Sequence, residues 1–346
     1  RLLSSQPGVR ALRPLRGYKE SPEKAWLNDV SSVCLQQSLR NLDCAFNSFF
    51  RKKSAYPSFK SRKNGGSARF MDNAFQIKGD GLFLAKIKTP IVIKWSRQLS
   101  STPNSCTISQ NAAGQWFALF LCEEEIQHLP PTTNKVGVDV GIESFCTLSD
   151  GQKFSQPKKI KRLRKKLARL QRLHSRKQKS SRNREKARLK IARLHQHVKN
   201  VRTDFLHKLS TKLVHENQVI ALEDLVVSNM IKNRHLARAI SEQGWRDFRR
   251  MLEYKAEWYG RELLIVDRFY PSSKTCSCCG AKASFGLETR TWTCGACGAS
   301  HDRDVNAAKN ILAAGQAVSD CGVDGRPTKN YVLRGRTLRS SKPSQR

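Results

Sequence analysis

The chain has 346 residues, of which 64 are Lys or Arg and 28 are Asp or Glu, so its formal net charge is +36. A charge of this size exceeds what solubility requires and predicts a polyanionic partner, with nucleic acid as the first candidate. An anionic membrane surface is the competing explanation, but the sequence has no run of about 18 apolar residues and its charge is spread along the chain, so no membrane partner is expected.

The first elements in the chain are an expected helix, a basic loop and a group of strands. From Ser21 to Phe50 apolar residues recur at three- and four-residue spacing, which is typical of an amphipathic helix. Residues 52–69 interrupt that pattern with a proline, two glycines and several Lys and Arg residues, which predicts a basic loop. From Phe70 to Cys122 short alternating runs separated by glycines predict the strands of a small barrel or sheet. Two prolines in residues 127–134 indicate a domain linker.

A strand hairpin and a strongly basic helical hairpin are expected next. Residues 135–154 contain two apolar runs with a turn at Asp150-Gly151, which predicts a β-hairpin. Residues 158–199 hold nineteen Lys or Arg and one acid, yet leucines keep helical spacing, which favours two helices broken near Ser180-Ser181. A solvated coiled coil is the alternative. Because like charges repel along a helix, however, an almost unopposed basic surface favours contact with nucleic acid.

The remaining expected elements alternate between strands and helices. Residues 217–224 are apolar and end in acids, which predicts a buried strand with an exposed polar end. Residues 245–259 predict a helix and residues 262–268 another strand. A last helix is expected over 301–314, and the basic tail after Gly315 lacks apolar periodicity, so disorder is expected there.

The cysteines predict a metal site in a reducing compartment. Four of the cysteines form two Cys-x-x-Cys pairs, which are separated by fourteen residues and are each followed by a glycine; this is the spacing of a zinc ribbon with one tetrahedral ion. A redox dithiol would need only one pair, and Cys278 inside the first pair is a weaker ligand candidate. Four filled positions make the site structural, so any catalysis must come from elsewhere. The predicted zinc ligands are Cys276, Cys279, Cys294 and Cys297.

Three carboxylates stand at the ends of the expected elements: Asp139, Glu223 and Asp304. A two-metal nuclease needs such a set, because Mg²⁺ ions about 4 Å apart are held by carboxylates from neighbouring elements. Taken singly, each also has a simpler explanation, as a turn residue, a solvated strand end or a charge that favours a helix N-terminus.

Four segments of the sequence begin Gly137-Val-Asp-Val, Ile220-Ala-Leu-Glu, Tyr270-Pro-Ser-Ser and Trp292-Thr-Cys-Gly. They resemble conserved segments of the TnpB family, a group of insertion-sequence proteins related to type V CRISPR effectors. The resemblance covers about Trp26 to Ala314 and is most specific in the last segment. It implies an α/β RNase H/RuvC-like nuclease domain, with Asp139, Glu223 and Asp304 as the catalytic acids that bind magnesium and the zinc ribbon inserted before the third. It also implies an N-terminal β-barrel, wedge-like domain with a helical recognition segment.

The resemblance implies an RNA-guided, magnesium-dependent endonuclease that cuts both strands of DNA. A guide RNA derived from the transposon end would pair with the target, while the protein would read a short flanking DNA motif and the heteroduplex backbone. The expected cofactors are Mg²⁺ in a two-metal site and structural Zn²⁺, and the expected location is the cytoplasm, at the bacterial nucleoid. A nuclease-inactive RNA-guided DNA-binding protein is the alternative. A DDE transposase is disfavoured because it requires the chain order Asp, Asp, Glu, and the order here is Asp, Glu, Asp.

The expected domains follow from these elements. A helical recognition segment and basic loop occupy 1–69, a wedge-like barrel 70–128, and the nuclease domain 129–314, including the basic helical hairpin 158–200 and the ribbon 271–300; a disordered basic tail occupies 315–346. The family opens with a Met and an initial strand and helical region, so several tens of residues are expected to precede Arg1.

Basic residues in three places are candidate nucleic-acid contacts. The block that begins at Tyr56 resembles the family's segment near the flanking-motif duplex, and Arg303 and Asn306 flank the third acid, where they could orient the scissile phosphate. The alternatives are a solvated loop for the first and helix capping and packing for the second. The candidates are Lys60, Arg62, Lys63, Arg69, Lys165, Arg169, Arg172 and Arg303.

Overall fold

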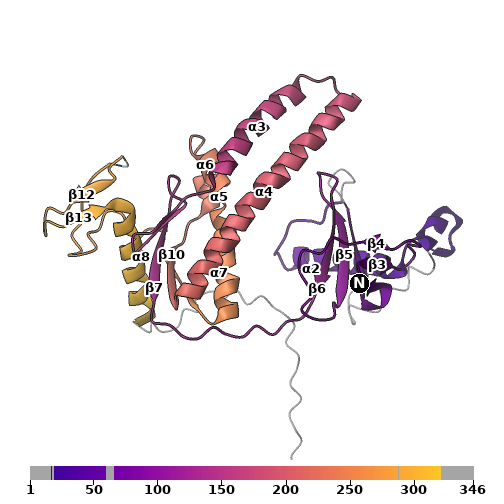
Figure 1. The fold of residues 1–346 in the computed structure, drawn as a ribbon, viewed down its shortest axis with the longest axis horizontal. Helices are drawn as coiled ribbons and strands as arrows, with labels where there is room; N and C mark the ends of the chain where they lie inside the picture. Colours follow the sequence, from indigo (N-terminus) through magenta and orange to yellow (C-terminus); the bar gives the residue numbers. More distant parts are fainter. Residues whose placement is uncertain (1–16, 18, 60–65, 287, 321–346) are drawn as a thin grey trace, which may run out of the picture. The chain divides into compact units, whose positions relative to one another are not determined.

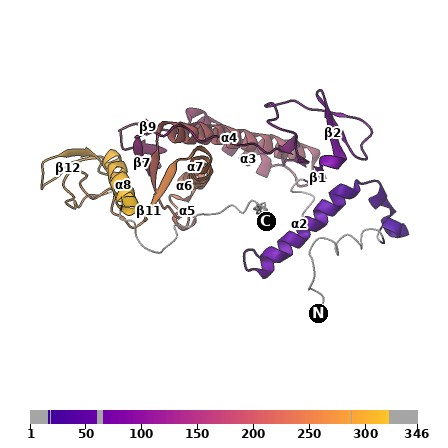
Figure 2. The same ribbon diagram turned by 90° about the horizontal axis from the view of Figure 1, so that it is seen from below.

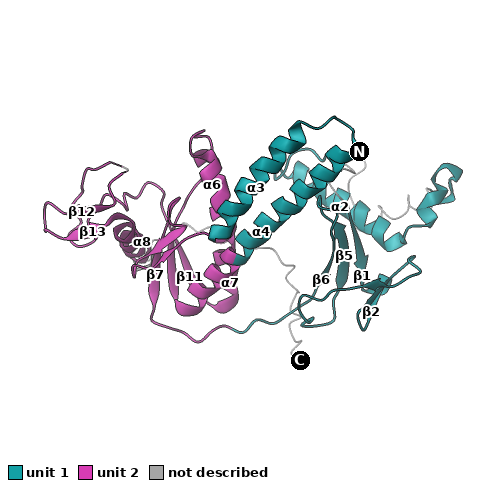
Figure 3. Ribbon diagram, turned by 45° about the horizontal axis from the view of Figure 1, so that its top comes forward, with its two compact units in different colours: residues 1–127, 157–204 teal, residues 128–156, 205–346 magenta. Residues whose placement is uncertain are grey.

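The computed structural model describes residues 17, 19–59, 66–286 and 288–320, and the chain divides into two compact units (Figure 1; Figure 3). Unit 1 comprises residues 1–127 and 157–204, and unit 2 comprises residues 128–156 and 205–346. Three of the predicted nucleic-acid contacts, Lys60, Arg62 and Lys63, and the tail 321–346 lie outside the described residues. No helix of the described part of the chain is long and apolar enough to cross a membrane.

The N-terminal helix of unit 1 is shorter than predicted. A 3-10 helix, η1 (Pro22–Asn28), precedes α2 (Ser32–Phe50), so the single helix expected from Ser21 to Phe50 is interrupted. Ser31, at φ −54° and ψ 126°, is not helical, and Lys24 departs from helical angles within η1. The apolar spacing therefore identified the helical region but not its break.

The strands of unit 1 form two antiparallel three-stranded sheets (Figure 1). Their apolar residues share one core, which includes Phe70, Leu82, Leu84 and Cys106 and also receives Cys34 of α2. The described strands are not paired into one closed barrel, so the predicted barrel stays an expectation. One sheet has the order β1 (Ser67–Met71), β5 (Ser105–Gln110), β6 (Trp116–Leu121), the other β2 (Phe75–Lys78), β3 (Gly81–Leu84), β4 (Ile91–Val92), with η3 (Asp72–Ala74) between β1 and β2.

The predicted basic helical hairpin is present as α3 (Lys158–Ser175) and α4 (Arg182–Glu216), which lie side by side (Figure 1; Figure 2). The guanidinium of Arg184 donates to the carbonyl oxygens of His174 and Lys177 at 3.3 and 2.7 Å, which closes the turn between them. Helix α4 extends beyond the predicted segment because its later leucines, such as Leu209 and Leu213, are buried in the core of unit 2.

Unit 2 is an α/β unit built on a five-stranded mixed sheet with the order β11-β10-β7-β8-β9. Strands β7, β10 and β11 are parallel, and β8 and β9 continue from β7 as antiparallel strands, which confirms the predicted hairpin. Two short helices before α7 were not predicted. The elements are β7 (Lys135–Val140), β8 (Cys146–Leu148), β9 (Lys153–Phe154), β10 (Val219–Glu223), α5 (Val227–Met230), α6 (Ala237–Gln243), α7 (Trp245–Tyr259), β11 (Glu262–Val266) and α8 (Arg303–Asp320).

The two faces of this sheet differ in residue size. Val136, Val138, Ile220 and Leu222 belong to the large core that α4 and α7 complete. The opposite face is covered by α8, which approaches β7 so closely that a Cβ on Gly137 would lie 2.0 Å from the carbonyl oxygen of Ala308. The sequence Gly-Val-Asp in β7 thus allows close packing of α8 two residues before Asp139, on the same face of the strand.

A short antiparallel pair, β12 (Thr291–Thr293) and β13 (Ser300–Asp302), precedes α8. The prediction that the last helix begins at His301 is wrong, because His301 pairs with Trp292 as part of β13. Helix α8 begins at Arg303, and the side chain of Asp302 caps it by accepting the backbone N–H groups of Asp304 and Val305 at 3.1 and 3.0 Å. Helix α8 also continues past Gly315, to Asp320.

Candidate metal centres

The three predicted acids gather at one end of the sheet of unit 2. Strands β7 and β10 pair with Leu222 opposite Val138, so the next residues, Glu223 and Asp139, are neighbours on the face covered by α8. Asp304 lies in the first turn of α8, the helix that packs against this face. Three segments far apart in the sequence therefore bring their carboxyl groups together.

Electrostatics places Asp139 at the centre of this group. Burial, followed by repulsion from Asp304 and Glu223, raises the pKa of Asp139 to about 8, although Arg303 opposes the shift. Burial and the neighbouring Asp224 also raise the pKa of Glu223. Carboxyl groups whose ionised forms repel one another gain most from a bound cation, so the group has the chemistry of a metal site.

The three carboxyl groups are more widely spread than the four cysteine sulfurs of the ribbon. Among the described residues, the three do not bring an oxygen each to within 4.8 Å of one another, which the four cysteine sulfurs of the ribbon do. Ligands held at about 2.1 Å from two different Mg²⁺ ions that are about 4 Å apart can be up to roughly 8 Å from each other.

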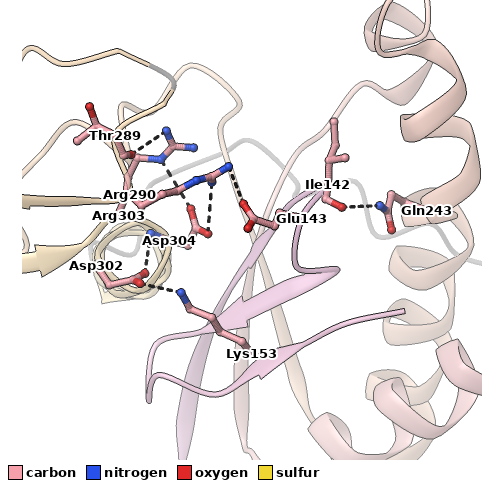
Figure 4. A network of polar contacts seen from close by, with 9 residues as sticks. All are labelled: Ile142, Glu143, Lys153, Gln243, Thr289, Arg290, Asp302, Arg303 and Asp304. Atoms are coloured by element: carbon pink, nitrogen blue, oxygen red, sulfur yellow. Dashed lines mark hydrogen bonds and ion pairs between the residues drawn. The ribbon is translucent and has the colours of Figure 1, made fainter. Parts of the chain in front are cut away.

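Charged side chains lie around Asp304, and only one of them was a candidate from the sequence (Figure 4). The Arg290 guanidinium lies 2.6 Å from the Glu143 carboxylate, on the loop after β7, and 4.0 Å from that of Asp304. Nε of Arg303 lies 3.7 Å from Asp304, while its Nη1 donates to the carbonyl oxygen of Thr289. Only Arg303 was a candidate from the sequence, because nothing in the local pattern around Arg290 or Glu143 indicates this contact.

The acid that follows Glu223 is held by two further arginines. Asp224 accepts hydrogen bonds from Arg249 of α7 and, at 2.6 Å, from Arg268 after β11. These cations hold the pKa of Asp224 below its usual value, against the effect of its partial burial. Asp224 is therefore directed toward the arginines, and the network fixes the end of β10 that carries Glu223.

The four predicted zinc ligands form one cluster. The sulfurs of Cys276 and Cys297 are 3.7 Å apart and those of Cys279 and Cys294 are 3.6 Å apart. A tetrahedron with Zn–S bonds of about 2.3 Å has edges of about 3.8 Å, so the residues present fit a zinc ion. Gly280 and Gly298 follow the two pairs at φ +77° and +71°, values that favour glycine in such tight turns.

His301 adds a contact to this cluster that the sequence did not indicate. Its Nε2 lies 3.1 Å from the sulfur of Cys276. Burial opposes ionisation of Cys276, but the backbone N–H groups of Cys279 and Cys278, together with His301, lower its pKa to about 5. A thiolate at this position is the form that binds zinc. Cys278, His301 and Cys276 make a second close group, so Cys278 remains the weaker alternative ligand.

The predicted nucleic-acid contacts that the structure describes lie on separate elements. Lys165, Arg169 and Arg172 are exposed on α3, at spacings of four and three residues that align them on one side of the helix. Arg69 lies in β1 of unit 1, and its guanidinium donates to the hydroxyl of Ser105. Arg303 is half-buried beside Asp304.

Asn306 does not have the arrangement expected of a phosphate-orienting residue. It is 1% exposed, and its amide accepts from the Ser277 backbone N–H at 2.9 Å and donates to the Thr275 carbonyl at 2.7 Å. Of the two sequence-based interpretations of Asn306, packing is the one that fits.

Comparison with known proteins relates two successive segments of the chain to described families. A family profile described as a probable transposase (OrfB_IS605) matches residues 119–234, and one described as the TNB domain of Cas12f1-like proteins matches residues 245–311. The chain is 50% identical over 341 residues to a Streptomyces pristinaespiralis protein provisionally named an RNA-guided DNA endonuclease, with 97% of this chain and 85% of the relative covered. It is 38% identical over 333 residues to InsQ of Escherichia coli K12, which carries the same provisional name, with 90% and 82% covered.

A solved structure shares the fold. The cryo-EM structure of Cas12f1 with its sgRNA and target DNA matches with a TM-score of 0.51 at 16% identity, and the match covers 81% of this chain and 71% of that chain. At this identity the likeness concerns the arrangement of the elements alone.

Proposed function

The chain belongs to the TnpB family, and from this premise we propose that it is an RNA-guided endonuclease that cuts double-stranded DNA at a RuvC-like site in unit 2. The observation that carries the proposal is the meeting of Asp139, Glu223 and Asp304, whose mutual repulsion calls for bound cations. Magnesium bound there would stabilise charge on the phosphodiester and activate a water molecule for in-line attack.

Different residues of the chain would have different roles at that site. Asp139, which interacts electrostatically with both other acids, would hold the magnesium ions together with Glu223 and Asp304. Arg290 and Arg303 supply positive charge at the same place, and such groups stabilise a phosphoryl transition state. The four cysteines would hold a structural zinc ion, so they take no part in the chemistry.

The expected partners are a guide RNA from the transposon end and a target DNA beside a short flanking motif. The charge of +36 supplies sequence-independent attraction to both. The exposed stripe Lys165, Arg169 and Arg172 would contact a nucleic-acid backbone, as would Arg69 and the basic loop that carries Lys60, Arg62 and Lys63. Sequence would be read by base pairing with the guide.

The test is cleavage of a matched plasmid by the protein with guide RNA and Mg²⁺. We expect D139A, E223A and D304A to lose at least about a hundredfold in rate, since each removes a metal ligand, and to keep guided DNA binding in a gel-shift assay. The control is E257Q, which removes a negative charge from an exposed position on α7 of the same unit. Undiminished cleavage by D139A would refute the assignment, and guided binding without cleavage by the unaltered protein would support the nuclease-inactive alternative.

A further inference from the structure

Two buried asparagines on α8 hold the polypeptide that enters the first cysteine pair. Asn306 binds the backbone on both sides of Cys276, donating to the carbonyl of Thr275 and accepting from the N–H of Ser277. One side chain thus fixes the two peptide groups that flank a zinc ligand. The oxygen and the nitrogen of the Asn306 amide each make a hydrogen bond, and the residue is buried. These contacts therefore fix the orientation of the backbone around Cys276 as well as its distance from α8.

Asn310, one helical turn further along, binds the same segment. Its Nδ2 donates to the carbonyl of Ser272 at 2.8 Å and to that of Thr275 at 2.6 Å, and the residue is 5% exposed. Residues four apart share one side of a helix, so Asn306 and Asn310 form a polar strip that faces the segment 272–277. Loss of these hydrogen bonds would leave buried backbone groups without partners, which is unfavourable.

The second cysteine pair reaches α8 by a short covalent path. Cys297 is seven positions before Asp304, and the residues between them include β13 and the capping residue Asp302. Nζ of Lys153 in β9 binds the other oxygen of Asp302 at 2.7 Å, so the start of α8 is also tied to the sheet (Figure 4). Both cysteine pairs are therefore anchored within the first two turns of the helix that carries Asp304.

A zinc ion that joins the two pairs would close these anchors into a ring. The ring runs from Asn306 to Cys276, across the ion to Cys297, and back through β13 to α8. We propose that Asn306 and Asn310 are positioning residues that couple zinc occupancy of the ribbon to the placement of Asp304, so that zinc strengthens metal binding by the carboxyl groups. This inference rests on the proposed function, because it assigns the carboxyl group of Asp304 to a metal site.

The proposed coupling predicts how zinc changes the binding of divalent cations and how those cations change the binding of zinc. If zinc orders the first turn of α8, divalent cations should bind the acids more tightly in the zinc-loaded protein than in the zinc-free protein, and by linkage they should slow the loss of zinc. Typical coupling between two sites changes affinity by about 5–150-fold. Substitution of the asparagines should abolish the coupling while leaving all the cysteines and all the acids in place.

The experiment measures Mn²⁺ binding to the full chain by electron paramagnetic resonance, with Mn²⁺ in place of Mg²⁺. Zinc-loaded protein is compared with the same protein after a chelator has removed the zinc and has itself been dialysed away, and the D139A variant identifies the signal that belongs to the carboxyl groups. We expect zinc to tighten this Mn²⁺ binding by about tenfold in the unaltered protein. In N310L and N306A we expect weak binding with zinc present and no further change without it. The control is K309Q, at an exposed position on α8 between them, which should retain the tenfold effect.

A purely structural role predicts a different pattern. Circular dichroism would then report a less stable protein, while the folded fraction of each variant would keep zinc-dependent Mn²⁺ affinity, and that result would overturn the inference. Equal Mn²⁺ affinity in the zinc-loaded and zinc-free unaltered protein would overturn it without any asparagine variant. Guided DNA cleavage is measured separately. Cleavage without zinc-dependent Mn²⁺ affinity refutes the coupling alone, and absence of Asp139-dependent Mn²⁺ binding refutes both.

Discussion

The repulsion among the three acids makes a prediction about stability that needs neither RNA nor DNA. The perturbation is D139N, which keeps the size and polarity of the side chain and removes the charge. Burial and two neighbouring carboxylates raise the pKa of Asp139 from 3.8 to about 8. A carboxyl group whose pKa is raised on folding stabilises the folded state fully only below its unfolded pKa, and that stability is lost as pH rises through the folded value. The Asn side chain carries no such penalty.

The magnitude follows from the same shift. Each pKa unit corresponds to about 1.4 kcal/mol, and at pH 7 about three units of the shift are expressed, which gives an upper limit of roughly 4 kcal/mol. Because Glu223, whose own pKa is raised, can adjust its protonation, we expect D139N to gain about 2–4 kcal/mol at pH 7 in magnesium-free buffer. The gain should grow with pH from 5 to 7, by at most about 1.4 kcal/mol per unit, and level off above pH 8.

The assay is urea unfolding of zinc-loaded protein at several pH values, with E257Q as the control for loss of one exposed negative charge in the same unit. Mg²⁺ should then stabilise the unaltered protein and not D139N, because the ligand that lies between the other two acids is gone. A D139N protein that is no more stable than the unaltered one at pH 7, or whose gain does not change between pH 5 and pH 8, would show that burial and the neighbouring acids do not raise the pKa of Asp139 as described.

Three further predictions concern the elements that support the site. G137A should lose about 2–4 kcal/mol in urea unfolding and most of its guided cleavage, since its Cβ would lie 2.0 Å from the Ala308 carbonyl oxygen and lift α8; wild-type stability would contradict this packing. Metal analysis should give one zinc per chain, and less in C294S, whose melting temperature should fall; full zinc content in that variant would contradict the assignment. Burial lowers the pKa of Lys255 to about 8, so the unaltered protein should gain stability between pH 8 and pH 10, a rise that K255M should lack.

The features that depend on local pattern could be predicted from the sequence. Residues 245–259 form the predicted helix, because the apolar period of an amphipathic helix is a property of the local sequence. The four cysteines cluster as predicted, because the spacing of the two pairs is also a property of the local sequence. The boundary at His301 could not be placed, because His301 pairs with Trp292 within β13 and capping by Asp302 starts α8. Such boundaries depend on partners that the local sequence does not identify.

The contacts around the acids could not be predicted for a related reason. Arg290 reaches Asp304 only because the pairing of β12 with β13 brings their neighbouring residues together, and the backbone N–H of Arg303 donates to the Arg290 carbonyl oxygen at 2.8 Å. Glu143 faces the same guanidinium from a loop after β7. In the sequence, Arg290 and Glu143 are indistinguishable from ordinary surface charges, because the sequence of a loop does not show which side chain a charged residue contacts.

The two sides of α8 show how one helix serves both metal centres. Successive residues of an α-helix turn by about 100°, so Asp304, Ala308, Ile311 and Gly315 lie along one side, which faces the sheet. Asn306 is about 200° from Asp304 on the same scale, which turns it away from the acids and toward the cysteine pair. Closeness in sequence suggested that Asn306 acts on the substrate with Asp304. Helical geometry separates them, and the buried amide of Asn306 is placed to hold the backbone on either side of Cys276 against the helix that carries Asp304.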